Sequence, residues 1–257
     1  MKINFKLAIV GFLAFSSLIF GEKIVVGATP VPHAEILEIV KSELAKKGFE
    51  LEIKVFNDYV IPNLATNDGE LDANFFQHIP YLNEFNANKG TKLIKTVGVH
   101  LEPMGIYSKK IKNLDQLKDG AKISLPNDPT NESRALDLLA TTGLIKLSED
   151  TLKTPLDIIE NSKNLEFVEI DAASLPRTLD DVEISIINTN FALNAGFNPI
   201  KDALVIEGKE SPYVNIIAVK EGNENSEKIK ALNEVLNSEI VRNFINKKYN
   251  GAIIPAF

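Results

Sequence analysis

The sequence predicts an α/β protein made of two lobes with a cleft between them. Three observations lead to this prediction. Residues 23–55 have the pattern strand, helix, strand, which gives a right-handed crossover and a parallel sheet. Residues 109–210 contain a second α/β unit, and after it one more strand and helices return toward the first unit. At 257 residues and 44% hydrophobic composition, the chain is long enough for two such units.

The first unit begins with residues 23–28, a short apolar run between glycine and proline that is typical of a buried parallel strand. Apolar residues recur at helical spacing over 32–47, and Gly48 can end that helix. Alternation over 51–55 predicts the next strand. The other elements expected in this unit are a short helix over 59–66, a strand over 72–76, a helix over 80–88 and a strand over 92–99.

The stretch PNDPTNESR, residues 126–134, predicts a strand, a turn and the start of a helix. It follows an apolar run, and the helical spacing after it ends at Gly143. Asp128 or Thr130 can cap the helix by accepting a backbone N–H, and Pro129 suits the first turn because its missing N–H would have no partner there.

Arg134 is unusual within this predicted helix. A cation in the first two turns faces the positive end of the helix dipole, which is unfavourable by about 0.3–1 kcal/mol when exposed. We expect an anionic group close to the guanidinium. The alternative is a surface arginine that reaches Glu132 or water.

The two units are expected to be connected by two crossings, near residues 100–108 and 210–216. We therefore assign residues 22–105 and 213–257 to one lobe and residues 106–212 to the other, with a ligand cleft at their interface. The remaining predicted strands are 103–108, 121–125, 165–170, 184–188, 203–206 and 214–219, and the remaining predicted helices are 113–118, 173–179, 191–195, 226–238 and 239–248.

Residues 1–21 are expected to be a secretory signal peptide. They begin with Lys2 and Lys6, continue with an apolar run too short for a comfortable membrane span, and end at Gly21. An uncleaved anchor is the alternative. Cleavage changes the formal charge from −7 to −9, because two lysines and no acids are removed, and this argues against nucleic acid and anionic membranes as partners. The chain has no cysteine, so it has no disulfide and no thiol for a lipid.

The most aromatic passage, DANFFQHIPY over residues 72–81, follows the third strand. Aromatic side chains there can wall an apolar pocket, because open α/β sheets bind ligands beyond the carboxyl ends of their strands. Phe75 and Phe76 could equally be core residues, whereas His78 and Tyr81 need polar partners if buried. Tyr59 can add a further aromatic from the same lobe.

Amides gather at two other strand ends. Asn188 and Asn190 follow the strand 184–188, where one of them could instead cap the next helix, and Asn215 lies at the second crossing. Together with Arg134 and the aromatics, these groups suit a zwitterion with an apolar tail. Arg134 would hold its carboxylate bidentately, the amides its ammonium, and the aromatics its side chain, for which a thioether is well suited.

Enzyme classes find little support. There is no nucleophilic cysteine, no Gly-x-Ser-x-Gly elbow and no phosphate-binding glycine loop. His33, His78 and His100 lie in no metal-ligand spacing, so we expect no metal and no cofactor. An exported enzyme acting on amino acids or peptides, and an adhesin without a ligand, remain as alternatives.

Four motifs carry a family resemblance: DANFFQH (72–78), PNDPTNxxR (126–134), INTN (187–190) and ESPYVN (210–215). With PHAE (32–35) and NDYVIPN (57–63), the chain resembles the NlpA family of substrate-binding proteins of methionine ABC importers over nearly its whole mature length.

The resemblance implies a type II periplasmic-binding fold that closes on L-methionine, or on a dipeptide such as glycyl-methionine, and delivers it to a membrane permease with an ATPase. By the same resemblance, Arg134 would hold the carboxylate, Asn188 and Asn215 the ammonium region, and Tyr59, Phe76, His78 and Tyr81 the side chain. Which of Phe75 and Phe76 faces inward stays open. Family members are usually anchored through a cysteine after the signal, which is absent here. We therefore expect a soluble, monomeric periplasmic protein.

Overall fold

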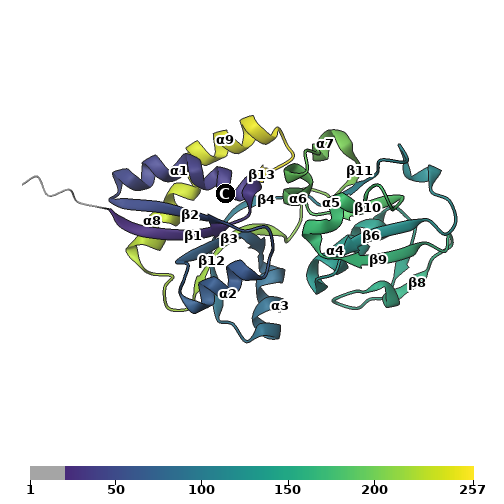
Figure 1. Ribbon diagram of the computed structural model, residues 1–257, viewed down its shortest axis with the longest axis horizontal. Coiled ribbons are helices and arrows are strands. Elements are labelled where there is room, and N and C mark those ends of the chain that lie inside the picture. The colour runs from purple at the N-terminus through teal and green to yellow at the C-terminus, as the bar shows by residue number, and fades with distance from the viewer. Residues whose placement is uncertain (1–20) are drawn as a thin grey trace, which may run out of the picture.

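The computed structural model describes residues 21–257, and apart from Gly21 the predicted signal peptide lies outside the described residues. The chain forms two lobes side by side (Figure 1). The prediction of a two-lobed α/β fold is confirmed by the two separate sheets, each covered by helices.

The first lobe is built on a six-stranded sheet in the order β13-β4-β12-β3-β1-β2. Its first strand, β1, pairs in parallel with β2 and β3, as the opening strand, helix, strand pattern predicted. β12 runs antiparallel between β3 and β4, so the returning chain closes this sheet. The strands are β1 (Glu22–Ala28), β2 (Phe49–Val55), β3 (Ala73–His78), β4 (Leu93–Leu101), β12 (Val214–Lys220) and β13 (Ile254–Pro255).

Helices cover both faces of the first sheet (Figure 1). One face packs against α1 (Glu35–Lys46), α8 (Glu227–Leu236) and α9 (Glu239–Tyr249), and the other against α2 (Ile61–Asp68) and α3 (Ile79–Lys89). The main core lies under α1 and includes Ile24, Leu37 and Phe75, all fully buried. A helical turn, Pro30–Ala34, precedes α1, so the helix predicted from residue 32 begins three residues later.

The second lobe has a five-stranded sheet in the order β11-β5-β10-β6-β9. β6 pairs in parallel with β9 and β10, while β5 is antiparallel to β10 and β11. Its members are β5 (Gly105–Tyr107), β6 (Lys122–Pro126), β9 (Glu166–Ile170), β10 (Ile184–Ile187) and β11 (Ala203–Ile206), and a hairpin of β7 (Lys146–Leu147) and β8 (Ile158–Glu160) is attached.

α4 (Pro129–Thr141) packs on one face of this sheet through Leu136 and Leu139. The other face packs against α5 (Leu175–Thr178) and α6 (Thr189–Asn194), and α7 (Pro199–Asp202) leads into β11. The sequence prediction missed the short elements α7, β7, β8 and β13, and the helix expected over 113–118 is a single turn, Leu114–Gln116.

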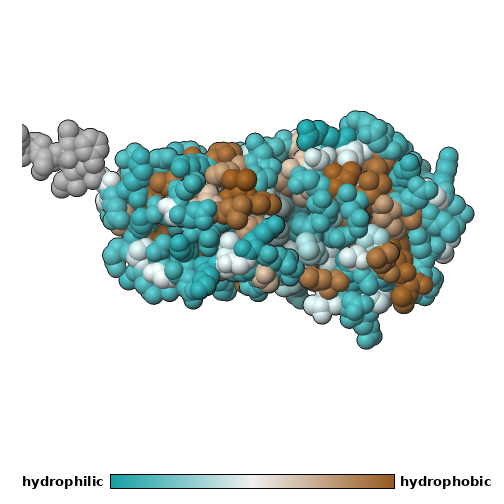
Figure 2. Space-filling view, turned by 60° about the horizontal axis from the view of Figure 1, so that its bottom comes forward, coloured by the Kyte–Doolittle hydropathy of each residue, from teal (hydrophilic) through white to brown (hydrophobic). Residues whose placement is uncertain are grey.

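The chain passes twice between the sheets, from β4 to β5 and from β11 to β12. Residues 102–104 form the first crossing, so the strand expected over 103–108 is shorter than predicted, and residues 207–213 form the second. The face shown in Figure 2 is mainly hydrophilic, with separate hydrophobic areas on each lobe.

Candidate functional site

A cavity lies between the lobes, beyond the carboxyl ends of β3 and β10 and beside the two crossings. It contains about 330 Å³ of space not filled by protein atoms, including space open to solvent at its mouth. Ligand sites usually occupy about 300–1,000 Å³, so this cavity suits a small molecule. Its lining residues are Tyr59, Phe76, Gln77, His78, Tyr81, Glu102, Asn131, Arg134, Asn188, Thr189, Asn190 and Asn215. Eight of the nine residues predicted for the site line it together.

Arg134 enters the cavity from the second turn of α4. Local sequence places it there: Asp128 caps the helix by accepting the N–H of Asn131 at 3.0 Å, and Pro129 occupies the first turn. The side chain is 4% exposed and its guanidinium lies 4.2 Å from the ring centre of Tyr213. The expected anionic partner exists, and it is Glu207 from the second crossing.

Glu207 changes the predicted role of the guanidinium. Arg134 Nε and Nη2 donate to Glu207 at 3.1 and 2.5 Å, and Nη2 also donates to the backbone oxygen of Glu102 at 2.8 Å. The bidentate position expected for a ligand carboxylate is therefore filled by Glu207 in this structure. Among the described residues, Arg134 Nη1 donates to no hydrogen-bond acceptor, so this nitrogen is the one left for a ligand.

Asn188 presents an unpaired carbonyl to the cavity. It stands at the position before α6, but its side chain does not cap that helix. Its amide nitrogen donates to Asn131 Oδ1 at 2.9 Å, and its buried Oδ1 has no hydrogen-bond partner among residues 21–257. A buried acceptor without a partner is costly, and a ligand N–H would satisfy it.

Asn215 and Asn190 are already held by other side chains. Asn215 lies on β12, and its Oδ1 is 2.9 Å from His33 Nε2. Asn190 Oδ1 accepts from the Tyr59 hydroxyl at 2.7 Å, which joins the two lobes. These amides are therefore fixed in orientation before any ligand arrives.

Aromatic rings wall the opposite side of the cavity. Tyr59 stacks on Phe76 with centroids 5.6 Å apart, and it meets Tyr81 at 5.8 Å and Phe191 at 4.9 Å. The Tyr81 hydroxyl donates to the backbone oxygen of Tyr59 at 3.0 Å. Such a wall can hold an apolar side chain, and a sulfur atom would gain from contact with ring edges.

His78 ends β3 and caps α3. Its Nδ1 accepts the N–H of Tyr81 at 3.2 Å, so Nε2 carries the hydrogen that it shares with Asn131 Oδ1 at 3.2 Å. Burial, helped by the positive charge of Arg134, lowers the pKa of His78 to about 3. The ring is therefore neutral at physiological pH.

Phe75 does not line the cavity, which corrects its inclusion among the site residues. It is fully buried in the core under α1, and its ring meets His33 at 4.7 Å and His100 at 5.3 Å. Successive side chains of a strand point to opposite faces of the sheet, so only one of Phe75 and Phe76 can face the cavity, and it is Phe76.

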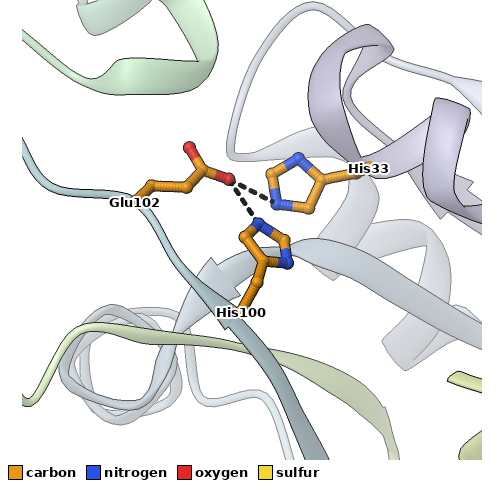
Figure 3. A group of neighbouring side chains, drawn as sticks. All are labelled: His33, His100 and Glu102. Atoms are coloured by element: carbon orange, nitrogen blue, oxygen red, sulfur yellow. Dashed lines mark hydrogen bonds and ion pairs between the residues drawn. The ribbon is translucent and has the colours of Figure 1, made fainter. Parts of the chain in front are cut away.

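Glu102 forms a buried group with His33 and His100, which do not themselves line the cavity (Figure 3). Glu102 Oε1 is 2.7 Å from His100 Nε2 and 3.2 Å from His33 Nε2. Burial lowers the pKa of His33 to about 4 and that of His100 to about 3, so both rings are neutral. His33 precedes His100 by 67 positions and Glu102 by 69, and no spacing rule applied to the sequence could bring it together with them.

The same three side chains are the part of the described chain that best resembles a metal-ligand set, with donor atoms within 4.8 Å of one another. The 2.7 Å separation is, however, a normal hydrogen-bond length, and His100 Nε2 donates to the carboxylate, while His33 Nε2 bonds to Asn215 Oδ1 at 2.9 Å and lies 3.2 Å from the carboxylate. His33 Nδ1 is bonded to Thr29 Oγ1 at 2.7 Å, which leaves Nε2 as its donor. The group is best described as a hydrogen-bonded carboxylate.

Sequence reasoning missed several residues of the site. Asn131 could have been found, since it lies one helical turn before Arg134 in the same motif. Glu102 could have been noted as an acid within the predicted first crossing. Nothing in the sequence distinguished Glu207 from other acids. The other missed residues in or beside the cavity are Gln77, Thr189 and Tyr213.

The family follows from comparison with known proteins. The model of the NlpA lipoprotein family matches residues 24–257. This chain belongs to that family. The resemblance inferred from the four motifs is thereby confirmed.

Similar members of the NlpA lipoprotein family include two curated relatives and one solved structure. D-methionine-binding lipoprotein MetQ of Salmonella typhi is 42% identical over 259 residues, covering 97% of this chain and 96% of that protein. Methionine-binding lipoprotein MetQ of Bacillus subtilis is 46% identical over 241 residues, covering 91% and 88%. A nutrient binding protein from Burkholderia cenocepacia, solved bound to methionine, is 43% identical with a TM-score of 0.89, covering 91% of this chain and 100% of that one.

The relatives are named lipoproteins, and their names describe binding proteins. The sequence of this family member has no cysteine. Within residues 21–257, none of the helices is both long and apolar enough to cross a membrane.

Proposed function

We propose that this protein is the substrate-binding component of an ABC importer and that it binds L-methionine in the cavity between its lobes. One observation carries the proposal: the cavity combines a buried guanidinium, an unpaired amide carbonyl and an aromatic wall. These are the groups that an amino acid with a long apolar side chain requires. The names of the relatives support the same ligand.

In the proposed complex, Arg134 Nη1 binds the ligand carboxylate, Asn188 Oδ1 and Asn215 bind the ammonium region, and the aromatics bind the thioether. Tyr59, Phe76, His78 and Tyr81 form that apolar part, with Asn190 fixing the Tyr59 hydroxyl. No group in this assignment is asked to break or form a covalent bond, so we propose a binding protein that is not an enzyme.

Closure of the lobes is the proposed signal to the transporter. His78 of β3 bonds to Asn131 of α4, and Tyr59 bonds to Asn190, so hydrogen bonds cross the cleft in this structure. We propose that the two lobes move as units about the crossings, one made of residues 22–105 and 213–257 and the other of residues 106–212. The closed form is the one that a permease and its ATPase recognise.

We place the protein in the periplasm as a monomer. Since the sequence contains no cysteine, attachment of a lipid to a cysteine thiol has no site within it. Fractionation of cells that express the full chain tests this point, because a lipid-anchored protein would sediment with membranes.

A methionyl dipeptide is the second candidate ligand. A groove lined by Val60, Tyr81, Phe85, Asp128 and Thr130 lies between α3 and α4 and shares Tyr81 with the cavity. This groove offers room for a residue attached to the amino side or carboxyl side of methionine.

Native mass spectrometry of the purified protein, followed by thermal shift with single ligands, tests the proposal. L-methionine should co-purify or raise the melting temperature, since a ligand at 100 times its Kd stabilises the folded state by about 2.7 kcal/mol. If D-methionine or glycyl-methionine stabilises the protein more than L-methionine does, that compound is the ligand, and the proposed role in an importer stays. Chemical turnover of any of them would instead favour an enzyme.

A further inference from the structure

We propose that Glu102 supplies the negative charge that holds the ammonium group of the ligand, and that His33 and His100 keep its carboxylate in place. This inference rests on the proposed function, because it assigns a further binding residue to the same cavity. It differs from the assignment above, in which neutral amides alone meet the ammonium.

Glu102 is well placed for this role. It lies on the first crossing, lines the cavity and is only 5% exposed. One oxygen, Oε1, faces both imidazoles, while the other points away from them (Figure 3). Among the described residues, no side chain donates a hydrogen bond to that second oxygen. The backbone N–H of Asn190 also faces the carboxylate, and a carboxylate oxygen can accept a further hydrogen bond from a group in the cavity.

The two histidines orient the carboxylate without cancelling its charge. Both rings are neutral because burial lowers their pKa values far below 7. A neutral imidazole can donate one hydrogen bond, so it fixes the oxygen and adds no positive charge that would cancel the charge of the carboxylate. The hydrogen bond from His100 Nε2 at 2.7 Å and the contact with His33 Nε2 at 3.2 Å, both on Oε1, restrict the orientation of the side chain.

The nearby cation compensates Glu102 only in part. Arg134 is the one lysine or arginine among the residues that line the cavity, and its guanidinium is paired with the carboxylate of Glu207. Its contact with Glu102 is to the backbone oxygen, at 2.8 Å. Burial raises the pKa of Glu102 and Arg134 offsets this only in part, so a cationic partner in the cavity would stabilise the ionised carboxylate.

His33 also connects this carboxylate to the second crossing. Its Nε2 lies 3.2 Å from Glu102 Oε1 and 2.9 Å from Asn215 Oδ1. One ring therefore positions two cavity residues that come from the two segments joining the lobes. His33 is a positioning residue, since it does not line the cavity itself.

Ligand binding should depend on pH through Glu102. Burial raises the pKa of this carboxyl, and an ammonium beside it favours the ionised form. Bound methionine would then lower that pKa. As pH falls through the pKa of the empty protein, binding must displace a proton, so the affinity for methionine decreases.

The test compares Glu102→Gln with the wild type by calorimetry, using L-methionine and its des-amino analogue, which lacks only the ammonium group. Loss of a buried charge partner should weaken L-methionine binding by roughly 30-fold or more. Binding of the des-amino analogue should stay equal or improve, because it has no ammonium to lose. Glu132→Gln is the matched control: Glu132 is also a buried carboxyl, on α4, but it does not line the cavity.

Equal weakening of both ligands would overturn the proposal, because a merely structural role predicts it. Retention of wild-type L-methionine affinity in Glu102→Gln would overturn it as well. If Glu102→Gln does not fold, the wild type alone is decisive: at about pH 6, where the carboxyl groups of both ligands are already ionised, L-methionine binding should release protons and the des-amino analogue should release none, whereas equal release contradicts the role of Glu102. Failure of the wild type to bind any methionyl compound would instead reject the proposed function.

Discussion

Glu207 holds Arg134 through two nitrogens, with Nε 3.1 Å and Nη2 2.5 Å from its carboxylate oxygens. This pair explains how a cation is tolerated near the positive end of α4. It joins the helix that carries the site to the segment that returns to the first lobe. A ligand carboxylate must share Arg134 with Glu207 or displace it.

Replacement of Arg134 by alanine should reduce methionine affinity by about 2–5 kcal/mol, because the ligand carboxylate would be left buried without a partner. Isothermal titration calorimetry measures this loss. Arg177→Ala, at an exposed position of α5, is the control and should bind like the wild type. Near-wild-type affinity in a folded Arg134→Ala protein would show that the carboxylate binds elsewhere.

Glu207→Gln should make the empty protein less stable and the effect of ligand larger. Arg134 would lose its anionic partner while remaining buried, which is unfavourable until a ligand carboxylate arrives. We expect the melting temperature of the empty protein to fall by roughly 2–4 °C, equivalent to about 1 kcal/mol for a chain of this size. The exposed Glu210→Gln is the control. If methionine raises the melting temperature of Glu207→Gln no more than that of the wild type, Glu207 does not compete with the ligand carboxylate for Arg134.

Phe75→Ala and Phe76→Ala should have different consequences although the residues are neighbours. Phe75 lies in the core, so its loss should cost about 3–5 kcal/mol of unfolding free energy and leave ligand preference unchanged. Phe76 lines the cavity, so its loss should weaken binding of methionine more than binding of alanine. Denaturant unfolding and titration with both amino acids measure these effects. If Phe75→Ala instead changed ligand preference and Phe76→Ala only lowered stability, then Phe75 and not Phe76 would face the cavity.

Stability should decrease between about pH 5 and pH 8 because of Glu132. Burial and the neighbouring Glu169 raise the pKa of Glu132 from 4.5 to about 8. The folded state therefore binds a proton that the unfolded state releases. The stabilisation from this proton is fully present only below the pKa of Glu132 in the unfolded state, and it is lost as pH rises through the pKa in the folded state.

Glu132→Gln, which cannot ionise, should remove this part of the pH dependence and melt higher than the wild type at pH 9. Thermal melts at pH 5, 7 and 9 provide the comparison, with exposed Glu210→Gln as the control. Parallel melting curves for Glu132→Gln and wild type across this range would show that Glu132 is ionised in the folded protein.

The sequence by itself determined the local elements of the site. Hydrophobic periodicity, the Asp128-Pro129 cap and Gly143 predicted the strand, turn and helix that carry Arg134, because these signals act between residues close in the chain. The order of strands and helices determined the two-lobed fold. The motifs around Asn188 and Asn215 indicated strand ends, where parallel sheets place their ligand-binding groups.

Only the tertiary structure decided which partners these side chains have. Phe76 and not Phe75 faces the cavity because pairing with β12 fixes the register of β3. Glu207 meets Arg134, and His33 meets His100 and Glu102, across separations of 73 and about 70 residues. Contacts between such distant residues depend on how sheets, helices and crossings pack, and a pattern read along one chain carries no information about those distances.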